Sequence, residues 1–178
     1  MGTVVFILCV GPADKYCART CCTIALKQAL KLKELNPKAK VVVLYKDIRT
    51  FGFKERLYTQ AREQGVLFIR YDNEHKPKIS HLESKISIQI WEPMLGREMT
   101  LTPDMVVLSN PTVPSEGAHE LATRLKVPVD MDGFFLEAHV KLRPVDFASE
   151  GLFMAGLAHY PKFLDESIIQ AQAAAARA

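Results

Sequence analysis

The sequence has no apolar run near the roughly 20 residues that a helix needs to cross a bilayer, and no large excess of charge of one sign. Its 178 residues carry 23 Lys and Arg against 20 Asp and Glu, and the basic residues are scattered rather than gathered in a stripe. The first nine residues lack a basic stretch followed by a small-residue cleavage site. We therefore expect a cytoplasmic protein that binds neither nucleic acid nor a membrane.

Cysteine is absent from the whole chain after residue 22, because the four cysteines lie together at Cys9, Cys17, Cys21 and Cys22. Disulfide scaffolds spread their cysteines so that each bridge closes a useful loop, and a cytosolic compartment keeps such thiols reduced. The placement therefore favours a metal or redox site over a disulfide framework.

The hydrophobic pattern up to about residue 108 predicts short buried strands separated by amphipathic helices. Continuous apolar runs are typical of parallel strands that are buried on both faces, and a period of 3.6 residues indicates the helices. An alternating strand, a turn at 92–96 and a returning strand predict an antiparallel hairpin. The predicted strands are 4–9, 41–45, 66–71, 85–91, 97–102 and 105–108, and the predicted helices are 20–35 and 53–64.

This order of elements predicts an α/β fold. Residues 1–112 are expected to form a Rossmann-like three-layer domain with a parallel sheet and an antiparallel meander, as in the nucleotide domain of two-dinucleotide flavoproteins. Residues 113–178 are less regular. In this second segment we expect a helix at 115–125 with Ser115 as its N-cap, strands at 134–138 and 151–155, and an alanine-rich helix at 165–178 capped by Asp165.

The loop after the first strand departs from the dinucleotide-binding pattern. That loop normally carries Gly-x-Gly-x-x-Gly, which lets the backbone approach a pyrophosphate. Here it carries a Cys-x7-Cys-x3-Cys-Cys array immediately before a predicted helix. The N–H groups at the start of a helix favour anionic thiolates and a net-negative cluster. We interpret the loop as a thiol site in place of a nucleotide site.

Four thiolates can hold a [4Fe-4S] or [2Fe-2S] centre, or one zinc ion. Structural zinc sites usually pair two separated Cys-x2–4-Cys knuckles, whereas all four cysteines here come from one loop. Adjacent side chains on a helix diverge by about 100°, so Cys21 and Cys22 can bind one object only if it is bulky, as a cubane is, or if the backbone there is not yet helical. A redox dithiol and inert buried thiols are further alternatives. The residues alone favour an iron–sulfur cluster and leave the others open.

The chain resembles the iron–sulfur flavoprotein component of heterodisulfide reductase, HdrA, in several segments from about residue 4 to residue 178. They include FILCVGPADKYCARTCC, ALKLKELNP, VVVLYKDIRTFGFKE, VVLSNPTVPSEGAHELA, GFFLEAHVKLRPVDFASEGLFMAGLAHYPK and DESIIQAQAAAARA. The resemblance implies the carboxy-terminal part of a thioredoxin-reductase-like flavoprotein region, with a [4Fe-4S] cluster on the four cysteines and residues 113–178 as part of an FAD-binding domain. It implies an oxidoreductase whose FAD splits electron pairs between a disulfide and a low-potential ferredoxin.

The resemblance also implies roles for residues outside the cysteine loop. Lys27 matches a family lysine that lies near the flavin ring and adjusts its reactivity, although a solvated helix face is the alternative. The segment 151–159 resembles a second FAD-binding motif, with Leu157 where an aspartate is usual. The expected FAD contacts are Gly156, Leu157, Ala158, His159 and Lys162.

Some of these expectations have open alternatives. His159 is either a flavin contact or a hydrogen-bonded structural histidine. Further candidates for flavin or partner contact are His139, Lys141 and Arg143, for which a solvated loop is the alternative.

The family's amino-terminal FAD half and its ferredoxin-type cysteine runs are absent from this sequence. We therefore expect other heterodisulfide-reductase-type subunits as partners, including a chain that supplies the missing FAD half and ferredoxin-like clusters. The chain is then either a naturally split subunit or an excised piece, and alone it is expected to bind FAD weakly or not at all. The alternative function is a non-catalytic, zinc-stabilised interaction module of the same fold.

Overall fold

The computed structural model describes residues 2–11, 16–82 and 85–178 and divides the chain into two compact units. Unit 1 consists of Met1–Cys17 and Cys21–Pro111, and unit 2 of Ala18–Thr20 and Thr112–Ala178. The three residues between Cys17 and Cys21 thus belong to unit 2, whereas the sequence prediction placed them in the first domain. None of the described helices is long and apolar enough to span a membrane.

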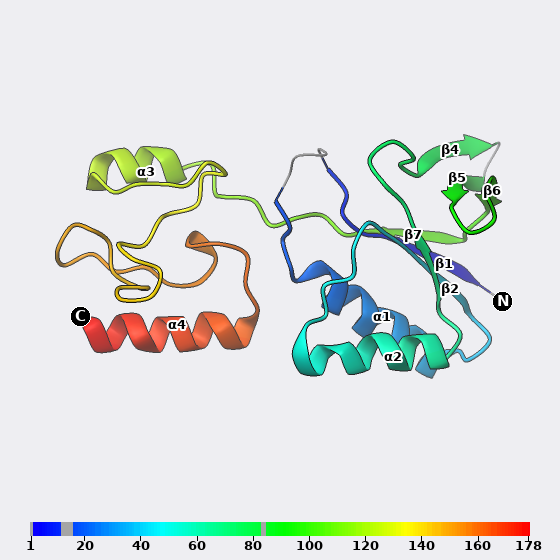
Figure 1. Cartoon of the computed structure of the whole chain (residues 1–178), viewed down its shortest axis with the longest axis horizontal. Helices are drawn as coiled ribbons and strands as arrows, with labels where there is room; N and C mark the ends of the chain where they lie inside the picture. The colour runs from blue at the N-terminus through cyan, green and yellow to red at the C-terminus, as the bar shows by residue number, and fades with distance from the viewer. Residues whose placement is uncertain (1, 12–15, 83–84) are drawn as a thin grey trace. The chain divides into compact units, whose positions relative to one another are not determined.

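The centre of unit 1 is a four-stranded parallel sheet in the order β3-β2-β1-β7 (Figure 1). Alternate residues of its central strands face opposite sides. Val4 and Phe6 pack on one face, while Val5 and Ile7 pack on the other. Because both faces are buried, the strand sequences are almost continuously apolar. The strands are β1 (Thr3–Ile7), β2 (Lys40–Tyr45), β3 (Leu67–Arg70) and β7 (Met105–Leu108).

The two faces of this sheet are covered by different layers (Figure 1). Helices α1 (Cys21–Leu35) and α2 (Glu55–Glu63), the latter preceded by the short turn η1 (Gly52–Lys54), cover one face. An antiparallel sheet covers the other, with its strands in the order β4-β5-β6. Its strands are β4 (Lys78–Leu82), β5 (Lys85–Glu92) and β6 (Arg97–Leu101). The predicted α/β class with a parallel sheet and an antiparallel meander is therefore confirmed.

Two local predictions in unit 1 were wrong. Strand β4 was not predicted, because Ile79, Ser80 and His81 are all exposed on this edge strand and show no apolar periodicity. The first strand was expected to run through Cys9 but ends at Ile7, because Cys9 adopts a left-handed backbone with φ of +56°. That conformation turns the chain out of the sheet.

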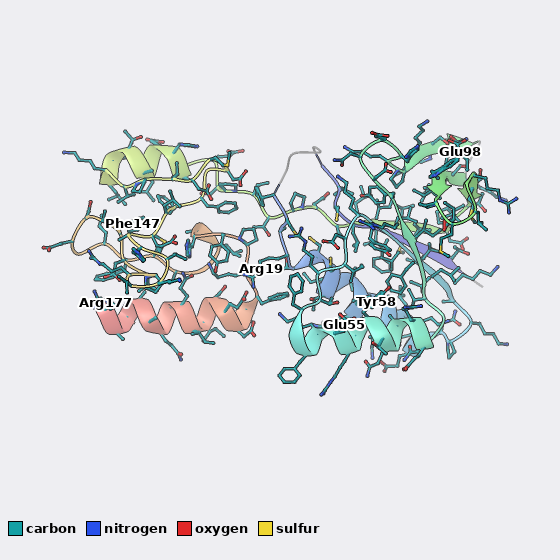
Figure 2. All side chains as sticks on the ribbon, viewed as in Figure 1. Arg19, Glu55, Tyr58, Glu98, Phe147 and Arg177 are labelled. Carbon is teal, nitrogen blue, oxygen red and sulfur yellow. The ribbon has the colours of Figure 1, made fainter. Side chains whose placement is uncertain are left out.

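Unit 2 contains helix α3 (Ala118–Leu125), the short turn η2 (Gly156–Ala158) and helix α4 (Leu164–Arg177). Its small core includes Phe135 and Phe147, whose rings meet edge to face with centroids 5.7 Å apart. Figure 2 shows Phe147 inside this unit and Arg177 at the last turn of α4. The guanidinium of Arg177 donates to the buried Asp146 carboxylate at 2.8 Å. Helix α4 is thereby tied to the irregular segment before it.

Several boundaries in unit 2 differ from the prediction. Helix α3 starts three residues later than expected, and the Ser115 carbonyl instead accepts the N–H of Ala118 in a preceding turn. Helix α4 is capped by Phe163 rather than Asp165, because Glu166 accepts the Phe163 N–H at 2.7 Å. The predicted strands at 134–138 and 151–155 are only isolated bridges, since each forms a single pairing with a neighbouring loop in the described chain.

Candidate functional site

The four cysteines lie around the end of β1 and the start of α1. Cys9 follows the strand, and Cys21 and Cys22 open the helix, where its N–H groups have no partner within the helix. Residues 12–15 of the connecting loop lie outside the described structure. No disulfide links any of these cysteines, all four of which are described.

A tyrosine fixes the backbone at the start of the cysteine loop. The hydroxyl of Tyr71, at the end of β3, donates to the carbonyl of Leu8 and lies 3.4 Å from the carbonyl of Cys9. Tyr71 is itself buried. A non-glycine residue in the left-handed region costs about 1–2 kcal/mol, so the turn at Cys9 needs this kind of support. Sequence reasoning placed Tyr71 in a strand and gave no sign of this role.

Burial and mutual repulsion act on the thiols at the start of α1. Burial is the largest cause that raises the pKa of Cys22 to about 11. The charges of Cys9, Cys21 and Cys17 act in the same direction, and a hydrogen bond from the backbone N–H of Arg49 acts against it. Burial likewise raises the pKa of Cys21, and Cys17 and Cys9 add to the effect. The fold thus brings all four predicted cysteines close enough to interact electrostatically.

The described thiols interact electrostatically, but they do not form a preassembled site for a metal ion. Within the described ranges, no group of three or more His, Cys, Asp or Glu side chains could hold a metal ion. A zinc ion needs all of its sulfur ligands about 2.3 Å from one centre, whereas a cubane carries its ligands on separate corners. The four-cysteine metal site therefore stays a prediction.

The thiols should differ in reactivity in the metal-free protein. Cys17 is exposed and Cys22 is buried, and a pKa of about 11 leaves only about one Cys22 in a thousand as thiolate at pH 8. We expect iodoacetamide to modify Cys17 first and Cys22 last, with the rate at Cys22 rising as pH increases toward 11. Mass spectrometry of the alkylated peptides measures this order. Equal rates at Cys17 and Cys22 would contradict the described burial.

The loop after β2 provides contacts that sequence reasoning missed. The Cys22 sulfur lies 3.6 Å from the backbone carbonyl of Asp47, to which its S–H donates, and it accepts the backbone N–H of Arg49. This loop lies at the carboxyl end of a parallel strand, which is where doubly wound folds bind ligands. That topological rule was the available signal for Asp47 and Arg49.

Lys27 lies on the exposed face of α1. It lines a shallow groove between α1 and α2, together with Lys31, Glu34 and Glu63. This position agrees with the alternative of a solvated helix face. The proposed role near a flavin ring stays a prediction.

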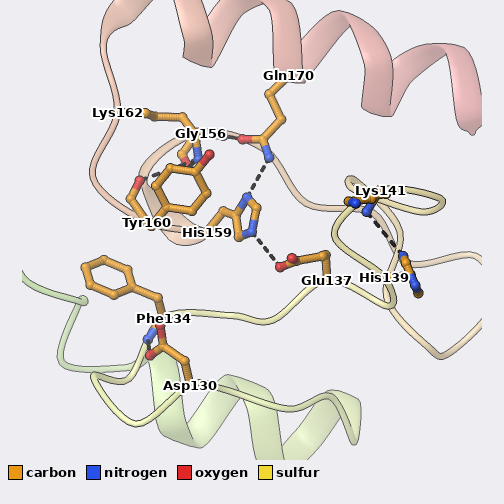
Figure 3. Close-up of polar contacts among 10 residues, drawn as sticks. All are labelled: Asp130, Phe134, Glu137, His139, Lys141, Gly156, His159, Tyr160, Lys162 and Gln170. Carbon is orange, nitrogen blue, oxygen red and sulfur yellow. Dashed lines mark hydrogen bonds and ion pairs between the residues drawn. The ribbon is translucent and has the colours of Figure 1, made fainter. Parts of the chain in front are cut away.

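A chain of hydrogen bonds holds the turn η2 in unit 2 (Figure 3). The N–H of Gly156 donates to Gln170 Oε1 at 2.9 Å, and Gln170 Nε2 lies 2.7 Å from His159 Nδ1. His159 Nε2 lies 2.7 Å from Glu137 Oε2. Because the amide oxygen of Gln170 already accepts from Gly156, its NH2 group must donate to Nδ1, so the His159 proton resides on Nε2 and points at Glu137.

Lys162 completes the same turn from the other side. Its ammonium donates to the Gly156 carbonyl at 3.0 Å and lies 3.7 Å from the centre of the Tyr160 ring (Figure 3). Burial lowers the pKa of Lys162 to about 8. Gly156 has φ of +71°, a conformation that glycine adopts without strain. The two contacts and the glycine together define the shape of the turn.

The five predicted flavin contacts therefore fall into two groups. Gly156, His159 and Lys162 use their polar atoms within unit 2, whereas Leu157 and Ala158 are exposed at the tip of η2. The structure gives the first group a role in shaping the turn and leaves the second group accessible. The role of all five toward FAD stays a prediction.

The other candidates, His139, Lys141 and Arg143, lie on an irregular loop. His139 Nδ1 accepts the backbone N–H of Lys141 at 3.2 Å, and both residues are exposed (Figure 3). Arg143 lies 3.5 Å from the Asp146 carboxylate. These contacts agree with a structured surface loop.

Curated proteins related to this chain are HdrA components of heterodisulfide reductases. The HdrA component of ferredoxin:CoB-CoM heterodisulfide reductase from Methanosarcina acetivorans is 36% identical over 181 residues, covering 98% of this chain and 22% of that protein. The corresponding iron-sulfur subunit of CoB–CoM heterodisulfide reductase from Methanocaldococcus jannaschii is 38% identical, covering 97% of this chain and 27% of that protein. The chain spans about a quarter of the length of these relatives. No protein-family model matches it.

Solved structures with the same fold are thioredoxin reductases. The enzymes from Lactococcus lactis and T. acidophilum give TM-scores of 0.61 and 0.59 at 17% and 13% identity, and the alignments cover 99% of this chain and half of each reductase. They confirm the predicted thioredoxin-reductase-like fold, and the curated relatives confirm the predicted resemblance. The chain is thus related, over nearly its whole length, to one part of the HdrA component of heterodisulfide reductase.

Proposed function

We propose that this chain carries a [4Fe-4S] cluster on Cys9, Cys17, Cys21 and Cys22 and passes single electrons between it and FAD, as part of a heterodisulfide-reductase-like oxidoreductase. The observation that carries the proposal is the gathering of four mutually interacting thiols in the loop where this fold otherwise binds a nucleotide. One relative is named an iron-sulfur subunit, which supports iron rather than zinc as the metal of the proposed site. We place the complex in the cytoplasm.

The chemistry of the donor set fits such a cluster. The charges of Cys9 and Cys17 raise the pKa values of Cys21 and Cys22, so the four sulfurs would repel as thiolates, and a cationic iron–sulfur core would relieve that repulsion. When bound, the cluster supplies a site that gains and loses one electron at a time. The residues of this chain hold the ligands. The start of α1 favours the anionic sulfurs of Cys21 and Cys22, and the Arg49 N–H donates to one of them.

The FAD site is proposed to be shared. Turn η2 and the start of α4 would contribute Leu157, Ala158 and the turn shaped by Gly156, His159 and Lys162. Helix α4, all of which is described, buries none of its residues and exposes Leu164, Ile168 and Ile169. An uncovered apolar face is what a missing domain half would leave. The half that completes the site would come from a partner subunit or from further sequence of the same protein.

The finer part of the proposal concerns the path of the electrons. Bound FAD would supply two-electron chemistry, with one electron of each pair proposed to reach a disulfide and the other to reach ferredoxin. The relatives' names include both heterodisulfide and ferredoxin as reaction partners of those proteins. Lys27 is proposed as the cation that adjusts the flavin. Partner subunits would supply the remaining clusters.

The test is metal, sulfide and flavin analysis of the chain purified without oxygen. We expect about four irons and four sulfides per chain with broad visible absorption, and little FAD. A colourless protein with one zinc ion would replace this function with a zinc-stabilised interaction module. Stoichiometric FAD bound to the chain alone would refute the shared flavin site.

A further inference from the structure

The loop after β2 contacts the most buried of the four cysteines. The Asp47 carbonyl and the Arg49 backbone N–H both meet the Cys22 sulfur. The loop is itself fixed, because Thr50 is buried and its hydroxyl faces the Glu55 carboxylate at the start of α2. Side chains on this loop therefore keep a defined position relative to Cys22.

The Arg49 side chain brings a positive charge to the same place. Its Nε donates to the Asp47 carboxylate at 2.9 Å, which holds the guanidinium in one orientation. The hydrogen bond to the Asp47 carboxylate raises the pKa of Arg49, and the charges of Cys17 and Cys22 raise it as well. Asp47 thus contacts both the Cys22 sulfur, through its carbonyl, and the Arg49 guanidinium, through its carboxylate, which places the guanidinium near Cys22.

We propose that Arg49 is a positioning residue that raises the reduction potential of the cluster by placing a permanent positive charge beside Cys17 and Cys22. The proposal rests on the function proposed above. One electron enters the cluster on reduction, and no bond of the protein forms or breaks. A nearby cation stabilises the more negative, reduced form more than the oxidised form. Exposure of the arginine side chain, 46%, weakens this effect without removing it.

At Arg49 the hydrogen bond to Cys22 comes from the backbone, whereas the positive charge comes from the side chain. Any residue except proline at position 49 retains the N–H that donates to Cys22. Arg49→Gln therefore removes the charge and its ion pair with Asp47 but keeps the backbone contact with Cys22, and Arg49→Lys retains the charge. The matched control is Arg97→Gln in β6, which makes the same change in net charge at an exposed position on the antiparallel sheet of unit 1.

The experiment is a potentiometric titration of the cluster in the anaerobically purified chain with dithionite as reductant. Electron paramagnetic resonance measures the reduced cluster at each potential. At a fixed ambient potential, we expect the ratio of reduced to oxidised cluster in Arg49→Gln to fall about threefold to tenfold. A tenfold fall is about 59 mV for a one-electron couple. Arg49→Lys and Arg97→Gln are expected to stay within about twofold of the wild type.

The outcomes separate this inference from the proposed function. A cluster in the wild type with an unchanged ratio in Arg49→Gln overturns the inference alone, as does an equal shift in Arg49→Lys and Arg49→Gln. Loss of the cluster from Arg49→Gln with retention in Arg49→Lys overturns the inference as stated, because the charge would then hold the cluster rather than adjust its potential. Loss from both variants overturns it in favour of a purely structural role. A wild-type chain that binds no iron overturns the proposed function, and this inference with it.

Discussion

Replacing Cys22 with serine is expected to leave the protein without its cluster. Cys22 is the buried thiol of the four, and its sulfur is held by the loop after β2 through Asp47 and Arg49. A serine hydroxyl has nearly the same shape but is a much poorer ligand for iron than a thiolate. Iron and sulfide should fall from about four of each per chain to less than one. Chemical iron and sulfide analysis after anaerobic purification measures the change.

The matched control for this prediction is the next residue along α1. Thr23 is buried, and its hydroxyl has no hydrogen-bond partner among the described residues. Thr23→Val alters the same helical turn without touching a sulfur, and it is expected to keep about four irons. A Cys22→Ser protein that retained the full iron content would show that Cys22 is not a ligand.

Replacing His159 with leucine is expected to lower the free energy of unfolding of unit 2 by about 2–4 kcal/mol. The imidazole is buried between Glu137 and Gln170, and each partner would lose its hydrogen bond to a ring nitrogen. A buried polar group without a partner costs about 1–3 kcal/mol, and more when it is charged. Leucine replaces most of the buried apolar area of the imidazole, so the decrease in the free energy of unfolding measures mainly the lost hydrogen bonds.

The measurement needs a probe in unit 2. Trp91, the single tryptophan, lies in β5 of unit 1 and reports on the wrong unit. Amide hydrogen exchange in α4 during a urea series reports on unit 2 directly. The control is His139→Leu, an exposed residue whose loss should cost less than about 1 kcal/mol. Equal effects at the two histidines would rule out a structural role for His159 and favour a contact with flavin.

The same histidine predicts a pH dependence. Burial lowers the pKa of His159 below its ordinary value of 6.5, because the charged ring is poorly solvated. The charge of Lys162 also lowers it, while the hydrogen bond with Glu137 acts in the opposite direction. The unfolded chain therefore gains a proton at a higher pH than the folded chain does. Stability contributed by this group is complete above pH 6.5 and falls as the pH drops below it. His159→Leu should remove this contribution to the difference in the free energy of unfolding between pH 7 and pH 5.

The architecture of unit 1 followed from local pattern because its strands are buried on both faces. Such strands are continuously apolar, as in β1 and β2, and their order along the chain leaves few topologies. The hydrophobic pattern did not predict β4, because an exposed edge strand can pair with β5 without any apolar periodicity. It also failed in unit 2, where single bridges replace predicted strands and the core depends on Phe135 and Phe147 meeting across a long irregular segment.

The sequence by itself determined the α/β class, the location of the thiols in the first loop and the relation to a part of the HdrA component of heterodisulfide reductase. Each of these depends on residue type and short spacing along the chain. Only the tertiary structure decided that Tyr71 supports Cys9, that Arg49 meets Cys22, and that His159 lies between Glu137 and Gln170. These pairs are far apart in sequence, and no local pattern encodes which distant polar groups the fold brings within hydrogen-bonding distance.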